Sequence, residues 1–173
     1  MRGLCIALLG AGCSEPPIEE MMQAETALQA AQAAGAEDYV AADYNAAAEA
    51  LKDAKSKTES SDYGGALASA IDARQKAEKS KAKVASEKLK VRGDLESTLT
   101  GLSQEWDGLM ASTRKKRLNR VIKPAVDAAR ETYAQFIADV RGRMEAEDYI
   151  GALQVMKEAR TKITEIRELV GGS

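Results

Sequence analysis

The chain's only two thiols lie at its beginning, in the segment MRGLCIALLGAGC, as Cys5 and Cys13. Arg2 supplies a positive charge, residues 3–9 form an apolar run, and residues 10–12 are small. This order is typical of a secretory signal, and the apolar run is too short to span a membrane as a helix. Two cysteines so close to one end cannot cross-link the body of the fold, and no CxxC metal spacing occurs. The segment therefore predicts export.

Residues Leu8 to Cys13 resemble the lipobox of bacterial lipoproteins, although Gly10 stands where leucine is usual. In that family a signal peptidase cuts before the cysteine, which becomes diacylated and then N-acylated, typically with palmitate. The resemblance implies a signal peptide at 1–12, a lipid anchor on Cys13 and a tether at 13–17. An alternative interpretation is a buried apolar N-terminal helix with an incidental cysteine.

The residue after Cys13 bears on which membrane would carry the anchor. It is Ser14, and the sorting rule of enteric-type bacteria implies that a serine here permits transfer to the outer membrane. We therefore expect a lipid-anchored envelope protein on the periplasmic face of the outer membrane. The inner membrane stays open as the alternative, because the rule is not general across bacteria.

The densest charge feature is a basic cluster near the middle of the second half of the chain. Its cations can contact anionic lipid headgroups, lipopolysaccharide or an acidic cell-wall polymer. The alternative is that these cations only complement the dipole at a helix C-terminus. The net charge of −2 argues against a nucleic-acid partner. The basic cluster consists of Arg114, Lys115, Lys116, Arg117, Arg120 and Lys123.

Residues for catalysis are scarce. The chain has no histidine, which removes the commonest general base and metal ligand. It also has no G-x-S-x-G motif and no glycine-rich phosphate loop. Its many carboxylates lie at helical spacing beside lysines and arginines, where pairing on a polar face explains them. The sequence predicts a non-enzyme without a cofactor or a metal.

The composition favours helices as the elements that position these residues. Hydrophobic residues make up 45% of the chain, but aromatic residues only 4%, and alanine supplies much of the rest. Alanine has the highest helix propensity and buries little area, and only three prolines interrupt the chain. We therefore expect an all-α fold with a thin core, built from elongated helical hairpins.

Apolar spacing divides the chain into two three-helix units that share a long central helix. We expect the units at 18–91 and 92–173, and the shared helix from about Gly64 to about Lys116, with a break possible at Gly93. Within that helix the stripe reaches heptad spacing, which is typical of coiled coils. The heptad positions are Leu95, Leu99, Leu102, Trp106 and Leu109.

An internal repeat marks two turns. The stretch DYGGALASAIDARQKA from Asp62 returns 86 residues later as DYIGALQVMKEARTKI from Asp148. Each aspartate can cap the helix that follows. We expect the two tyrosines to fill the hairpin mouths, the two glycines to allow close approach of the incoming chain, and each Ala-Leu pair to begin a buried stripe. The motif is thus interpreted as a helix–turn–helix joint used twice.

The DYxxAL turn resembles the joint inside a tetratricopeptide repeat, but an 86-residue spacing is far from the roughly 34 residues of that repeat. Residues 34–77 more closely resemble a poorly characterised family of helical-hairpin domains in bacterial envelope lipoproteins. That resemblance implies an envelope role without an assigned activity.

Together these features predict a lipid-anchored, non-catalytic helical scaffold or adaptor for an envelope protein partner. Two alternatives remain at this point. One is a binding protein for cell-wall polymer or anionic glycolipid that works through the basic cluster. The other is a cytoplasmic coiled-coil protein whose first residues only mimic a signal. The partner's identity and the oligomeric state stay open.

Overall fold

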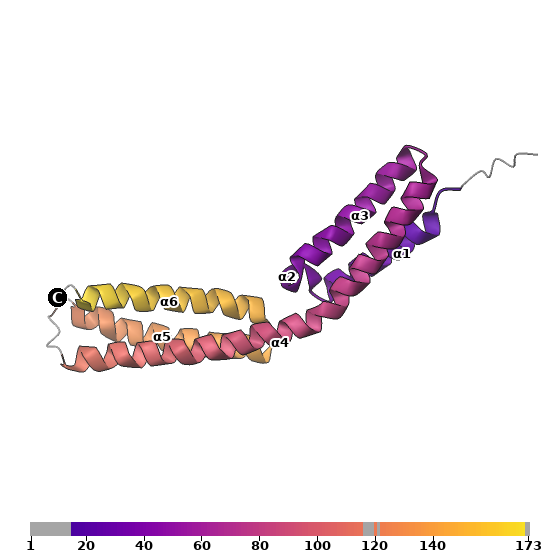
Figure 1. Cartoon of the computed structure of the whole chain (residues 1–173). Helices are drawn as coiled ribbons and strands as arrows, with labels where there is room; N and C mark the ends of the chain where they lie inside the picture. The colour runs from indigo at the N-terminus through magenta and orange to yellow at the C-terminus, as the bar shows by residue number, and fades with distance from the viewer. Residues whose placement is uncertain (1–14, 116–119, 121, 172–173) are drawn as a thin grey trace, which may run out of the picture. The chain divides into compact units, whose positions relative to one another are not determined.

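The computed structural model describes residues 15–115, 120 and 122–171, and these residues form helices and no strand. The predicted all-α fold is confirmed (Figure 1). None of the described helices is both long and apolar enough to cross a membrane. The helices are α1 (Ile18–Ala33), α2 (Ala36–Tyr39), α3 (Ala41–Glu59), α4 (Tyr63–Lys115), α5 (Ile122–Glu145) and α6 (Tyr149–Gly171).

The chain divides into two compact units between Val84 and Ala85, within α4. The sequence led us to place this division between residues 91 and 92. The first unit holds α1, α2, α3 and the beginning of α4, and the second holds the rest of α4 with α5 and α6. Backbone hydrogen bonding keeps α4 helical at Gly93, where the sequence allowed a break.

The first unit packs three main helices around small side chains, as its alanine content requires. Pro17 precedes the first turn of α1, where its missing N–H costs no helical hydrogen bond. Gly35, with φ of 92°, ends that helix in the left-handed conformation that glycine adopts readily. One core cluster joins Ala24, Leu51 and Ala73 from α1, α3 and α4. Each of these three helices thus supplies one residue to this cluster.

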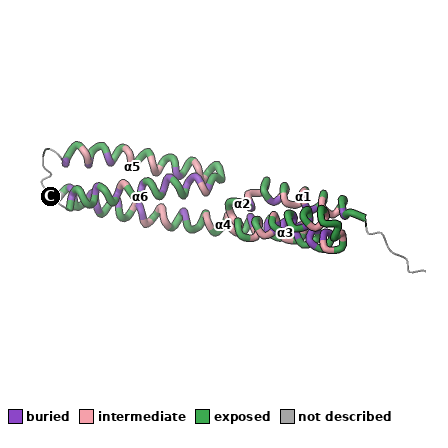
Figure 2. Tube along the Cα trace, turned by 90° about the horizontal axis from the view of Figure 1, so that it is seen from above, coloured by how far each residue is buried: buried purple, intermediate pink, exposed green. Residues whose placement is uncertain are grey.

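The second unit has the larger core side chains. Leu95, Leu102 and Trp106 on α4 are buried at the predicted heptad positions, whereas Leu99 is only partly buried. The Trp106 ring stacks on Tyr133 of α5, with ring centroids 4.3 Å apart and planes inclined by 15°. Figure 2 shows buried positions recurring along α6. The buried residues of α6 include Ala152, Met156, Ala159, Ile163 and Ile166, at helical spacing.

Candidate functional site

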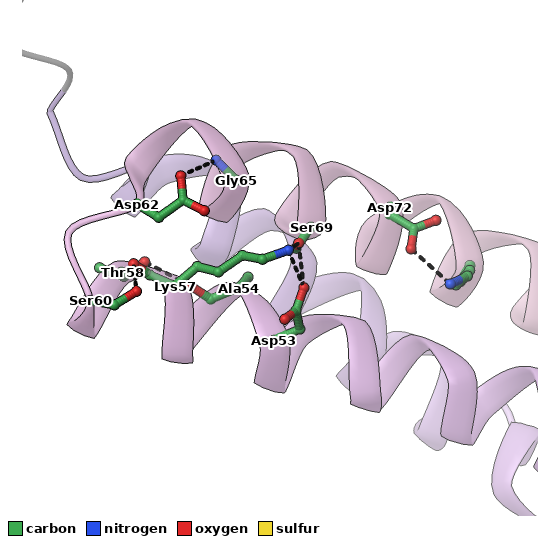
Figure 3. Close-up of polar contacts among 10 residues, drawn as sticks. Asp53, Ala54, Lys57, Thr58, Ser60, Asp62, Gly65, Ser69 and Asp72 are labelled. Carbon is green, nitrogen blue, oxygen red and sulfur yellow. Dashed lines mark hydrogen bonds and ion pairs between the residues drawn. The ribbon is translucent and has the colours of Figure 1, made fainter.

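The first joint of the repeat connects α3 to α4. Ser61 takes a positive φ of 62°, and the Asp62 N–H donates back to the Lys57 carbonyl at 2.9 Å. This bond satisfies a carbonyl that the end of α3 would otherwise leave unpaired. Asp62 Oδ1 then accepts the Gly65 N–H at 3.0 Å, which caps the start of α4 as predicted (Figure 3).

The second joint, between α5 and α6, has the same geometry 86 residues later. Glu147 has a φ of 58°, and the Asp148 N–H donates to the Arg143 carbonyl at 2.9 Å. Asp148 Oδ1 accepts the Gly151 N–H at 2.9 Å. The interpretation of the motif as a helix–turn–helix joint used twice therefore agrees with the backbone at both places.

Two expectations about the joints need correction. Leu67 and Leu153 do not begin a buried stripe, because they are 38% and 41% exposed, whereas the alanines before them are fully buried. The reason is that each leucine lies one residue beyond the core face, about 100° around the helix. The glycines leave room mainly for the capping aspartate. A Cβ at Gly65 would overlap the Asp62 carboxylate.

A polar cluster formed by Asp53, Lys57 and Ser69 ties α3 to α4 beside the first joint (Figure 3). Lys57 Nζ donates to Asp53 Oδ2 at 2.6 Å and to Ser69 Oγ at 3.0 Å. The Ser69 hydroxyl donates to the same Asp53 oxygen at 2.6 Å. Two hydrogen bonds lower the pKa of Asp53: the one from Lys57 has the larger effect and the one from Ser69 the smaller.

This cluster includes a serine beside a lysine, a pair that serves as nucleophile and base in some hydrolases. Here the Asp53 carboxylate, which accepts the hydrogen bond from Ser69, has a lowered pKa and is therefore a poor base. Lys57 is engaged in an ion pair with the same carboxylate. The arrangement is thus suited to holding two helices together, and sequence spacing alone did not single it out.

The second unit repeats half of this cluster. Arg143 Nε donates to Asp139 Oδ1 at 3.0 Å, as Lys57 does to Asp53 86 residues earlier. Val155 stands at the position that corresponds to Ser69, and Arg143 Nη1 turns to Asp148 Oδ2 at 2.8 Å. The hydrogen bond from the Gly151 N–H is the main cause of the lowered pKa of Asp148, and the hydrogen bond from Arg143 is the second. The cap in the second joint is therefore also an ion pair.

The residues proposed for lipidation and anion binding are only partly described. Cys13, Lys116 and Arg117 lie outside the described residues, as does the side chain of Lys115. Arg114, in the last turn of α4, and Arg120 are exposed.

Lys123, the last member of the basic cluster, lies on α5 and has an acidic partner. Its Nζ donates to Asp127 Oδ2 at 2.8 Å, and this bond is the main cause of the lowered pKa of Asp127. The free cations that the described part of the cluster offers to an anion are therefore Arg114 and Arg120. Within residues 15–115, 120 and 122–171, acidic and sulfur side chains form no group of three that could hold a metal ion.

A groove of about 510 Å³ lies between α1 and α4 in the first unit. Met22, Ala27 and Ala30 line it on α1, and Arg74, Glu78 and Lys81 line it on α4. The three α4 residues lie one position after the buried stripe of that helix, so the apolar spacing that predicts the core does not single them out. No family model, curated protein or solved structure matches the chain.

Proposed function

We propose that this protein is a bacterial envelope lipoprotein, held on the periplasmic face of the outer membrane by acyl chains on Cys13. In this proposal the chain is a non-catalytic scaffold or adaptor that offers helical faces to an envelope protein partner. The observation that carries the proposal is the order of the first residues: a charge, an apolar run, small residues and then Cys13, followed by a proline-containing tether. The first helix of the described part, α1, begins at Ile18, directly after that tether.

The polar groups of the described residues support a structural role. Within the Asp53–Lys57–Ser69 cluster the side chains hydrogen-bond one another and join α3 to α4. In the second joint Asp148 and Arg143 form a pair of their own. The groove between α1 and α4 is lined by alanines of α1 and by charged side chains of both helices, and such a mixed lining suits a helical partner.

The test is mass spectrometry of the protein recovered from its native membranes, beside a Cys13→Ala variant. The proposal expects an acylated peptide that begins at Cys13 and is lost in the variant. A soluble protein with an intact Met1 or Arg2 terminus would overturn it and leave the cytoplasmic coiled-coil alternative.

A second candidate function is binding to cell-wall polymer or anionic glycolipid. The exposure of Arg114 and Arg120 favours it. Pull-down with isolated cell wall at rising salt, with the Arg114→Glu and Arg120→Glu double variant, tests this candidate because phosphate and carboxylate contacts weaken with salt. A Lys123→Glu variant is the matched control, since Lys123 is already paired with Asp127. Unchanged binding by the double variant would exclude Arg114 and Arg120 as the residues that hold the anion.

A further inference from the structure

Helix α4 carries a second heptad-spaced stripe beside its buried one. The buried stripe in the first unit is Ala66, Ala70, Ala73, Ala77 and Ser80. The second stripe lies one residue further along and consists of Leu67, Ile71, Arg74, Glu78 and Lys81. Its spacings of 4, 3, 4 and 3 are those of a coiled-coil seam. Leu67 and Ile71 are 38% and 36% exposed, so this seam faces away from the core of its own unit.

The last three residues of the second stripe, Arg74, Glu78 and Lys81, line the groove against α1. Arg74 Nη1 donates to Gln23 Oε1 at 2.5 Å, so α1 and α4 lie side by side at these residues. Both helices run in the same direction (Figure 1). Glu19 therefore lies toward one end of the groove and Lys81 toward the other, with Arg74 and Glu78 between them.

We propose that a second copy of the chain occupies this groove, with the two α4 helices antiparallel. The two-fold axis passes between the seam positions Arg74 and Glu78, level with Lys76 along the helix. In an antiparallel coiled coil the seam positions that lie equally far from the axis face each other. Arg74 then meets Glu78 of the partner subunit, and Glu78 meets Arg74 of the partner subunit. Ile71 packs on the aliphatic stem of Lys81 of the partner subunit, as long basic side chains allow.

The charges of the groove favour a second copy over another occupant. Two acids, Glu19 and Glu78, alternate with two bases, Arg74 and Lys81, so the wall has no net sign that would select an acidic or a basic partner. Reversing the direction of the groove places Glu78 over Arg74, and brings the Glu19 end over the Lys81 end. A surface that becomes its own electrostatic complement on reversal fits an isologous dimer.

Arg74 is incompletely satisfied by its own chain. Its Nε lies 3.8 Å from Glu78 Oε1 on the next turn, too far for a hydrogen bond. Within the part of the chain that the structure describes, this buried Nε has no hydrogen-bond partner. The Arg74 side chain is nevertheless 39% exposed, so a carboxylate from a second copy can reach its outer nitrogens and give the guanidinium the paired contact that its geometry favours.

Sedimentation of the full chain carrying Cys13→Ser, in reducing buffer, tests the proposal independently of lipid attachment. We expect a dimer. Arg74→Glu or Glu78→Arg alone should raise the dissociation constant of that dimer by roughly ten-fold or more, because each variant places like charges together twice across the axis. An equimolar mixture of the two variants should restore the dimer, since one chain then presents acids at both positions and the other presents bases. Pairing within one helix cannot produce this rescue.

The matched control is Arg160→Glu, which changes the arginine that corresponds to Arg74 in the second unit, 86 residues later. It should leave the dimer at wild-type strength. A parent chain that stays monomeric at about 0.1 mM overturns the proposal, because that concentration exceeds the dissociation constant of any stable dimer. Dimers of wild-type affinity in both single variants, or a mixture that dimerises no better than either variant alone, overturn it too.

Discussion

Asp62 and Asp148 make the same hydrogen bond in two different joints. Each Oδ1 accepts the backbone N–H of the glycine three positions on, at 3.0 and 2.9 Å. The residue before each aspartate has a positive φ, of 62° and 58°. Two turns that agree in their cap and their backbone show that the repeat encodes a way of ending one helix and beginning the next.

The first prediction concerns the cap in the first joint. Asp62→Ala should lower the free energy of unfolding by about 1 kcal/mol, because the Gly65 N–H loses its acceptor. Asp62→Asn keeps a side-chain oxygen and should lose only a small part of this. Urea unfolding followed by circular dichroism measures both. Equal stability of the alanine and asparagine variants would show that the hydrogen bond does not stabilise the joint.

The joints and the main helices could be predicted from sequence because local rules decide them. An aspartate before a helix, and alanines at three- and four-residue spacing, act over one or two turns. The short α2 was missed because the left-handed Gly35 allows a separate turn before α3, and propensity does not distinguish such a turn from the helix that follows.

The polar cluster and the groove could not be predicted in the same way. The Ser69–Asp53 bond joins side chains on two helices, and the Arg74–Gln23 bond joins residues 51 positions apart. Such contacts depend on how two helices are rotated about their axes, which spacing on one helix does not determine. The exposure of Leu67 has the same origin. Leu67 follows the buried Ala66, and one step along the helix turns the side chain about 100° away from the core face.

The second prediction compares adjacent glycines. Gly65→Ala should destabilise the first unit by about 1 kcal/mol, because the new Cβ overlaps the Asp62 carboxylate and displaces the cap. At Gly64 an added Cβ meets no atom within 4 Å, so Gly64→Ala should stabilise the helix by up to about 1 kcal/mol. Thermal unfolding of the two variants gives opposite shifts. Shifts of the same sign would contradict the account of the cap.

The third prediction concerns the Asp148 carboxyl. Its pKa should lie below the ordinary 3.8, chiefly because the Gly151 N–H bonds the charged form and secondly because of Arg143. A lowered pKa means that ionisation stabilises the fold above about pH 4, and that this contribution is lost as the pH falls through the folded-state value. Carbon NMR of the carboxyl group, titrated with pH, measures it.

The Arg143→Gln variant separates the two causes of that shift. Its Asp148 pKa should rise above the wild-type value and still stay below 3.8, because the Gly151 hydrogen bond remains. A value at or above 3.8 would mean that the ion pair, and not the cap, lowers the pKa. Asp127 is the internal reference, because its lowered pKa comes chiefly from Lys123 and should not change in this variant.

The fourth prediction concerns the stacked pair in the second unit. Trp106 is 7% exposed and its ring lies 4.3 Å from that of Tyr133. Tyr133→Leu should lower the stability of this unit by about 1–2 kcal/mol through loss of the stack and of ring contact area. Tyr133→Phe keeps the ring and loses only the hydrogen bond that the hydroxyl donates to Ser103, so it should cost about 0.5–1.5 kcal/mol at most.

Trp106 is the only tryptophan of the chain, so its fluorescence reports unfolding of the second unit in both variants. The leucine variant should also shift the emission of the folded protein, because the stacking partner is gone, while the phenylalanine variant should leave that emission unchanged. Folded-state emission that stays the same in the leucine variant would mean that the two rings do not stack in solution. Burial of Trp106 alone would then have to account for the stability of this core.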